Sequence, residues 1–428
     1  MDRLLDPRIL ADRLSALPTF EPRTYLALNP DLALPEREAV LHFAAHGLRE
    51  HRPYCTAQSV VAALGRLDLP HPVAEMGTHD ALGALLARFV GETVGFYVHS
   101  ASDPRVRLEA EILAGRLAAW GIDTRICDES ADPDSRPEHP LVFAPHEFFF
   151  GEGGGARWLD PQILAGTILC PTLPLNLTLP LRSLPLLFAC RGVLDANLQT
   201  GRICAASGIP FAERLALPAD TVDLAAGYES DPLAPGLPAG LAVPGAPAPD
   251  WEARAVDLCL FGPSTTTRDE VLLRGASLFS EMRCVIPYPE TPRPALRRRA
   301  MGPARIALEP HVARNARVLL AIEPEEIGSL PGYEMALLGF RNGALVVTRP
   351  LHPHPIFRPG EHFLEETTRE IPHLVEWILR TPEGAAEARR IAARARAALD
   401  ETYSARGPLA ALRLIDATRT ATGVCRAG

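Results

Sequence analysis

Short apolar runs and longer amphipathic segments alternate along most of the chain. The apolar run at 91–100 is followed by an amphipathic helix at 104–121, and further apolar runs lie at 124–130, 140–150 and 166–172. The same order returns at 255–279 and continues through 317–326, 332–340 and 343–351. Strands that alternate with helices indicate a parallel, doubly wound sheet. We therefore predict an α/β fold with two Rossmann-like domains.

The alternation also predicts where the domains begin and end. Residues 1–70 are expected to form a small all-helical module, with helices at 6–17, 24–32 and 37–51. The first α/β domain is placed at 90–230 and the second at 255–382. A stretch dense in Pro and Gly, 231–254, is predicted as the linker. The remaining residues, 383–428, are predicted as helices that pack back across the domains, and 184–208 as a helix that ends at Gly208.

The charge balance excludes several classes of function. The chain has 428 residues and a formal net charge of −9, whereas a general nucleic-acid binder needs a basic face. It contains no lysine, so a Walker-type P-loop and a Schiff-base mechanism are excluded, and a phosphate site must use Arg, His or backbone N–H groups. No stretch is apolar enough to span a membrane.

The cysteines and histidines give no sign of a metal centre. Eight cysteines show no C-x-x-C pair and no zinc spacing, which fits a reducing cytoplasm. His42 and His46 share a helix face near His51, but no acidic residue or Cys completes a site. We expect no metal.

The segment 326–348 carries the strongest functional signal. Two glutamates, Glu326 and Glu334, flank a loop that contains Gly328 and Gly332 and leads into a helix and then a strand. In an α/β domain such a loop lies at the carboxyl end of a strand, where ligands bind. The glycines permit close approach of an anion to the backbone. Alternatively, the two glutamates only complement the dipole of the helix.

This segment resembles the E-x7-E signature of retaining GT-B glycosyltransferases, and residues 350–403 resemble the spore-maturation type of that family. The resemblance implies two domains facing across a cleft and a bacterial enzyme that transfers a hexose from a nucleotide-diphosphate sugar to a glycan, lipid or protein acceptor, with no cofactor. Glu334 would hold the donor ribose and Glu326 would lie beside the transferred sugar. The implied donor site comprises Glu334, Gly262, Ser264, Thr265, Gly328, Gly332 and Tyr333.

Two further segments supply candidate residues. In 261–270 the resemblance places Arg268 at the donor diphosphate, where a guanidinium grips phosphate bidentately; otherwise this turn is only a helix cap by Thr266 or Thr267. Related enzymes often pair this arginine with a lysine that the chain lacks. His146 and Glu147 follow a predicted strand and are the candidates for the acceptor side, although such a pair is more often structural.

Residues 20–54 resemble a small helical module that recurs beside bacterial glycosyltransferases, so a packing role or a protein partner is expected for it. Two other interpretations of the whole chain stay open. One is a non-catalytic glycan- or nucleotide-binding protein of the same fold, acting in a larger assembly. The other is a different two-Rossmann enzyme such as a sugar-nucleotide epimerase, which is less favoured because no G-x-G-x-x-G follows a strand.

Overall fold

The structure is a computed structural model. It describes residues 7–16, 19–50, 52–64, 66–67, 79–173, 181–214, 227–242, 248–262, 264–287, 303–322, 334–351, 354 and 356–423. These fall into two compact units. Unit 1 contains 1–102, 106–215 and 406–428, and unit 2 contains 103–105 and 216–405. Each unit contains one sheet, and every described strand pair is parallel. The predicted α/β fold is confirmed.

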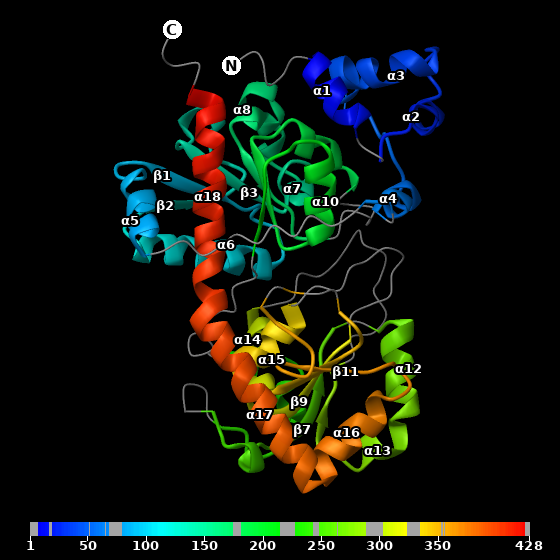
Figure 1. Ribbon diagram of the computed structural model, residues 1–428, viewed down its shortest axis with the longest axis vertical. Helices are drawn as coiled ribbons and strands as arrows, with labels where there is room; N and C mark the ends of the chain where they lie inside the picture. Colours follow the sequence, from blue (N-terminus) through cyan, green and yellow to red (C-terminus); the bar gives the residue numbers. More distant parts are fainter. Residues whose placement is uncertain are drawn as a thin grey trace. The chain divides into compact units, whose positions relative to one another are not determined.

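Unit 1 has a six-stranded sheet in the order β2-β1-β3-β4-β5-β6 (Figure 1). The central strand β3 is buried at every residue, whereas the edge strand β2 is largely exposed. The strands are β1 Thr93–Tyr97, β2 Asp123–Cys127, β3 His139–Phe143, β4 Ile168–Cys170, β5 Gly192–Asp195 and β6 Phe211–Glu213. The helices that follow the N-terminal module are α5 His79–Ala87, α6 Pro104–Ala119, α7 Pro145–Phe148, α8 Pro161–Ala165, α10 Leu198–Ala206 and α18 Ser404–Gly423.

One element of unit 1 differs from the sequence prediction. The segment 184–208 is not one helix: it contains a 3₁₀ turn at Leu184–Phe188, then strand β5, and only then α10. An apolar run of this length does not distinguish a buried strand from a buried helix by periodicity. Gly192, which begins this strand, permits close packing, since a Cβ there would lie 3.3 Å from both Leu414 and the Pro210 carbonyl.

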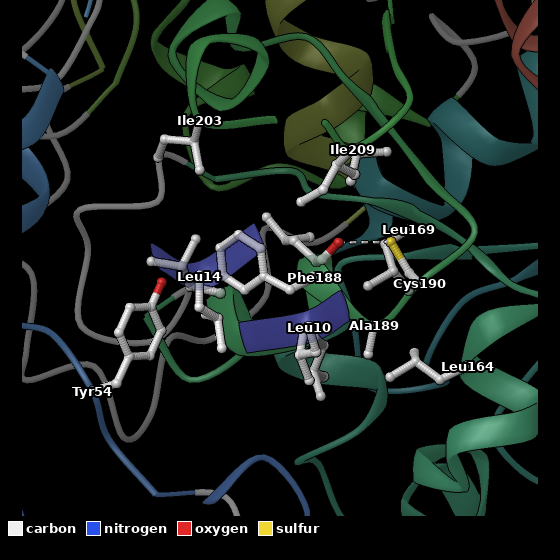
Figure 2. Packing of buried hydrophobic residues seen from close by; sticks show 14 of the residues in the cluster. Leu10, Leu14, Tyr54, Leu164, Leu169, Phe188, Ala189, Cys190, Ile203 and Ile209 are labelled. Carbon is white, nitrogen blue, oxygen red and sulfur yellow. Dashed lines mark hydrogen bonds between the residues drawn. The ribbon is translucent and has the colours of Figure 1, made fainter. Parts of the chain in front are cut away.

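The N-terminal module belongs to unit 1 and shares its core. Its helices are α1 Pro7–Ser15, α2 Pro22–Leu28, α3 Glu36–His42 and α4 Ala57–Leu64, with a π turn at Phe43–Gly47. Leu10 and Leu14 of α1 lie in one cluster with Phe188 and Ile203 of the sheet domain (Figure 2). Tyr54 contacts Phe188 edge-on, with ring centroids 6.2 Å apart. The apolar face of this module is therefore buried within its own unit.

Hydrogen bonds within residues 20–54 connect the helices and loops of the module. The Tyr25 hydroxyl lies 3.0 Å from His42 Nδ1. The Asn29 amide donates to the carbonyls of Tyr25 and Pro53, each at 2.8 Å. Arg52 donates to the carboxylates of Asp31 and Glu50. These polar groups fix the loops around an aromatic core, as expected for buried polar groups that find partners.

Unit 2 has a five-stranded sheet in the order β11-β10-β9-β7-β8, between two layers of helices (Figure 1). One face packs on α16 and α17, since Val318 and Leu320 share a cluster with Ile378 and Ile391. The strands are β7 Val256–Leu260, β8 Cys284–Val285, β9 Ala316–Ala321, β10 Leu345–Thr348 and β11 Leu364–Glu365. The helices are α12 Thr266–Arg274, α13 Ala276–Ser280, α14 Pro303–Asn315, α15 Glu334–Asn342, α16 Ile371–Arg380 and α17 Pro382–Ala398.

Helix α17 follows its sequence pattern closely. Thr381 caps its N-terminus by accepting from the Gly384 N–H at 3.0 Å, and Pro382 occupies the first turn, where it is well tolerated. The predicted apolar face is buried at every position: Ala388, Ile391, Ala392, Ala395 and Leu399. Burial of this stripe, rather than helix propensity alone, fixes the helix.

The last helix, α18, lies along the sheet of unit 1 and is joined to it by Arg191 (Figure 1). Arg191 precedes β5 and is nearly buried. Its Nε donates to Thr418 Oγ1 and its Nη2 donates to the Ile415 carbonyl, both at 2.8 Å. Burial is the main cause that lowers the pKa of Arg191 to about 10, so these hydrogen bonds offset a desolvation cost.

Within the described residues no helix is long and apolar enough to cross a bilayer.

Replacing Arg191 by Met is expected to lower the free energy of unfolding of unit 1 by about 2–4 kcal/mol, because the carbonyl and hydroxyl on α18 lose a buried donor. Urea unfolding followed by circular dichroism measures this change. Arg107→Met is the matched control, since Arg107 makes an exposed i,i+4 pair with Glu111, and such pairs contribute about 0.5 kcal/mol or less. Equal effects of the two substitutions would contradict the assignment of Arg191.

Candidate functional site

The carboxyl edge of the unit 2 sheet carries the described part of the 261–270 turn that the sequence singles out. Strands β7 and β9 are neighbours, but the chain leaves β7 towards β8 and leaves β9 towards β10. The connections after β7 and β9 therefore run towards opposite edges of the sheet, and such a switch point is the usual ligand position in open α/β sheets. Gly262 follows β7, and Ile322 follows β9. This edge is the candidate site in unit 2.

Arg268 connects these two strand ends. It lies in the first turn of α12, is 4% exposed, and donates from Nε to the Ile322 carbonyl at 2.6 Å. The remaining guanidinium atoms lie against Gly262: a Cβ on this glycine would be 2.4 Å from Nη1. Gly262 also has φ +110°, a conformation that favours glycine. The predicted site residues Gly262 and Arg268 thus lie in direct contact.

The hydroxyl-rich turn between them caps α12. Thr265 Oγ1 accepts from the Arg268 N–H at 3.3 Å, so Thr265 is the cap. The prediction that Thr266 or Thr267 caps this helix is wrong. The Ser264 hydroxyl donates to both carboxylate oxygens of Asp269, at 3.0 and 3.1 Å. Two of the predicted donor-site residues therefore have structural partners in this turn, and both remain beside Gly262.

Glu334 is the first residue of α15, which leads to β10. This position puts it at the N-terminus of the helix that begins beyond β9, where free backbone N–H groups favour anions. The other predicted donor residues, Glu326, Gly328, Gly332 and Tyr333, lie outside the described residues. The roles given to them remain predictions.

Gly262→Ala is expected to destabilise unit 2 by about 1–3 kcal/mol, because the new methyl group collides with Arg268 and must adopt an unfavourable φ. Thermal unfolding measures the change. Gly360→Ala separates the two causes, since Gly360 has φ +75° but no atom lies within 4 Å of the point where its new methyl group would be. A loss no larger than that of Gly360→Ala would show that the contact between Gly262 and Arg268 does not constrain the site.

In unit 1 the corresponding switch point lies between β1 and β3, because the chain leaves β1 towards β2 and β3 towards β4. His99 and Ser100 follow β1. His99 Nδ1 accepts from the Ala101 N–H at 3.0 Å, so its Nε2 carries the proton and donates to the Glu152 carbonyl at 2.7 Å. Ser100 donates to Glu129 from both its N–H and its hydroxyl. Neither His99 nor Ser100 is among the site residues predicted from the sequence.

The predicted acceptor-side residues, His146 and Glu147, lie in the short helix α7 after β3. The helix follows Ala144, the one non-glycine residue with positive φ among those described (φ 46°), and this turn brings α7 to the sheet edge. His146 is 7% exposed, and its Nε2 lies 3.7 Å from Glu147 Oε1. Phe148 and Phe149 are buried, as expected for core residues.

The glycine-rich loop after α7 packs tightly on unit 1. A Cβ on Gly154 would lie 2.4 Å from the Glu129 carbonyl, and one on Gly155 would lie 1.7 Å from the Phe148 carbonyl. A Cβ on Gly151 would lie 2.5 Å from His99 Nε2. These glycines are therefore required because the chain packs closely around them. From the sequence alone, a glycine-rich loop that packs in this way cannot be told from one that binds an anion.

Asp195 is a buried carboxyl that sequence analysis did not single out. It ends β5, is 2% exposed, and accepts from the Thr200 hydroxyl and from the Asn197 N–H. Burial raises its pKa from 3.8 to about 6, and the Thr200 hydrogen bond and the charge of Arg214 offset only part of this rise. A strand prediction for 192–195 would have placed Asp195 at the carboxyl edge of the sheet.

Asp195→Asn is expected to stabilise the protein at pH 7.5. A pKa raised in the folded state means that stability is present at low pH and lost as pH rises through about 6, which amounts to about 3 kcal/mol at pH 7.5. The advantage of Asp195→Asn in urea unfolding is expected to shrink by about 1 kcal/mol at pH 5. Asp123→Asn, at the exposed start of β2, is the control. A difference that does not change with pH would refute the burial argument.

Within the described residues, no group of three or more His, Cys, Asp or Glu side chains is placed to hold a metal ion. The rings of His42 and His46 lie side by side, with centroids 5.4 Å apart, and His51 lies outside the described part of the chain.

Comparison with known proteins gives distant likenesses among solved structures. No protein-family model matches the chain, and no curated protein matches it. Among solved structures, the chain is similar to a spinosyn forosaminyltransferase, with 10% identity over 76% of this chain and 99% of that chain and a TM-score of 0.35. It is also similar to a spinosyn rhamnosyltransferase, with 13% identity over 76% of this chain and 96% of that chain and a TM-score of 0.24. At these scores, neither likeness bears on the activity.

Proposed function

We propose that the protein is a glycosyltransferase that moves a hexose from a nucleotide-diphosphate sugar to a glycan, lipid or protein acceptor, with retention of configuration. The observation that carries the proposal is the position of Glu334, the second glutamate of the E-x7-E pattern. Glu334 begins α15, the helix that follows β9 along the chain, and Arg268 joins the end of β9 to the end of β7. A bacterial cytoplasmic enzyme without a metal or other cofactor is part of the proposal.

The donor would be held by unit 2. Glu334 would accept hydrogen bonds from the two ribose hydroxyls. The turn of Gly262, Ser264 and Thr265, together with Gly328, Gly332 and Tyr333, would surround the diphosphate and sugar. The N-termini of α12 and α15 both begin at this edge, and helix N-termini attract anions. This arrangement suits a substrate with two phosphates.

Catalysis would consist of stabilising charge as the sugar–phosphate bond breaks. The sugar would approach an oxocarbenium-like state, with Glu326 beside it. Arg268 would stabilise the departing nucleotide diphosphate, since a fixed guanidinium needs no reorganisation during the reaction. The hydrogen bond from its Nε to the Ile322 carbonyl would hold the guanidinium in place. His146 and Glu147 in unit 1 would orient the acceptor hydroxyl.

A non-catalytic nucleotide- or glycan-binding protein is the second candidate. Two observations favour it: the chain has no lysine to accompany Arg268, and Arg268 is nearly buried and serves to join two strand ends. Incubation with UDP-, GDP-, ADP- and dTDP-hexoses separates the two candidates. Release of the nucleoside diphosphate in the presence of acceptor extracts is expected of the enzyme, and binding without release is expected of the alternative.

Glu334→Ala is expected to weaken binding of the preferred nucleoside diphosphate by about 10- to 100-fold, because two hydrogen bonds to a charged acceptor are lost. A thermal-shift screen with UDP, GDP, ADP and dTDP identifies the ligand, since binding to the folded state raises Tm. Isothermal titration then gives the affinity of each variant.

Glu383→Ala is the matched control for Glu334→Ala. Glu383 also lies in the first turn of a helix, α17, and is exposed. Both substitutions remove a carboxylate from the first turn of a helix, and only Glu334 belongs to the proposed donor site. If Glu334→Ala binds the nucleotide as tightly as the wild-type protein, the donor-site assignment is wrong.

A further inference from the structure

A buried cluster of charged groups lies where α18 meets the amino-terminal edge of the unit 1 sheet. Arg191 donates to Thr418 and to the Ile415 carbonyl of α18. In the opposite direction, Arg419 of α18 pairs with Glu92, which precedes β1. The Arg419 guanidinium also lies 4.1 Å from the centroid of the Phe89 ring. The helix is thus held by arginines from both sides of the contact.

His139 lies at the centre of this cluster. It is the first residue of β3 and is 4% exposed. Its Nδ1 lies 3.1 Å from Arg191 Nη1, and its Nε2 lies 2.7 Å from Glu92 Oε2. Arg419 Nη2 lies 3.2 Å from the same Nε2. The imidazole therefore contacts both arginines that hold α18.

These contacts require a neutral ring. Arginine only donates, so Nδ1 must accept from Arg191 and cannot carry a proton. The single ring proton then lies on Nε2 and is donated to the Glu92 carboxylate at 2.7 Å. Nε2 therefore does not accept from Arg419, whose guanidinium pairs with the Glu92 carboxylate instead. A second proton would sit on Nδ1 and point at the Arg191 guanidinium. Nδ1 could then no longer accept the hydrogen bond from Arg191.

The surrounding charges also oppose protonation of His139. The titratable groups of the neighbouring segments are Arg191 before β5, Glu92 before β1, Arg419 and Asp416 on α18, Arg88 after α5, and Glu138 beside His139. Arg88 is paired with Asp416 at 2.6 Å, and the Glu138 carboxylate accepts from the Thr93 N–H. Burial is the largest cause that lowers the pKa of His139. The charges of Arg191 and Arg419 add to it, and the hydrogen bond to Glu92 opposes it.

We propose that His139 is a proton-sensitive latch for α18: the neutral imidazole holds Arg191 and Glu92 in place for the helix, and protonation releases it. The sign follows from the contacts. A ring that must be neutral when α18 is bound stabilises the bound helix above the ordinary pKa of histidine, about 6.5, and this contribution is lost as pH falls. The inference does not depend on the proposed function.

Hydrogen exchange of the full-length protein tests the latch. Protection of peptides from 407–419 is measured from pH 8 to pH 5.5, each value relative to the same peptide in the unfolded chain at the same pH. Protection in the wild-type protein is expected to fall by up to about tenfold between pH 7.5 and pH 5.5. His139→Gln should abolish this fall, because glutamine still donates to Glu92 but does not titrate.

His373→Gln is the matched control, since His373 lies exposed on α16 in unit 2; it should leave the pH dependence of 407–419 unchanged. A flat wild-type profile, or an equal fall in His139→Gln, overturns the proposal. Should His139→Gln fail to fold, NMR titration of the wild-type histidine rings decides. A His139 pKa clearly below 6.5 supports the latch, and a pKa at or above 6.5 overturns it.

Discussion

Parallel pairing of every described strand is the constraint on which the remaining organisation depends. Parallel neighbours cannot be joined by a tight turn, so each connection must cross a face of the sheet, usually as a helix. All strands then end at the same edge. This is why Gly262 and Ile322, sixty positions apart, become neighbours that one arginine can join. It is also why His99 and the α7 helix lie at the same edge of the other sheet.

The absence of lysine changes how the interior of the molecule is held. Arg191, Arg254 and Arg268 are each nearly buried, and each donates to a backbone carbonyl of a segment that is distant in sequence. Arg254, for example, donates to the carbonyls of Ala316 and Asn342. A planar guanidinium is suited to this because its donors point in several fixed directions and it is more weakly hydrated than an ammonium group. Arginine here joins segments that are distant in sequence.

Sequence patterns predicted the class of fold and several faces, but not the details that depend on distant contacts. The stripe on α17 from Ala388 to Leu399 was predictable because helical periodicity records burial directly. Strand β5 was not, because four buried residues within a long apolar run carry no period of their own. The contact of Arg268 with Ile322 and the burial of Asp195 depend on segments far apart in the chain. The spacing of residues within one motif therefore could not predict them.

The path of the chain affects how the protein can be divided. Unit 1 is built from both ends of the sequence, since 406–428 belongs with 1–102 and 106–215. A fragment ending at residue 215 would lack α18. The surface of unit 1 on which α18 packs, including Gly192 and the side chain of Arg191, would then be exposed to water. Leu412 and Ile415, which are buried in the intact chain, would be left on the other fragment. A folded first domain therefore calls for a circular permutation or a fusion that returns α18 to it, rather than a simple truncation.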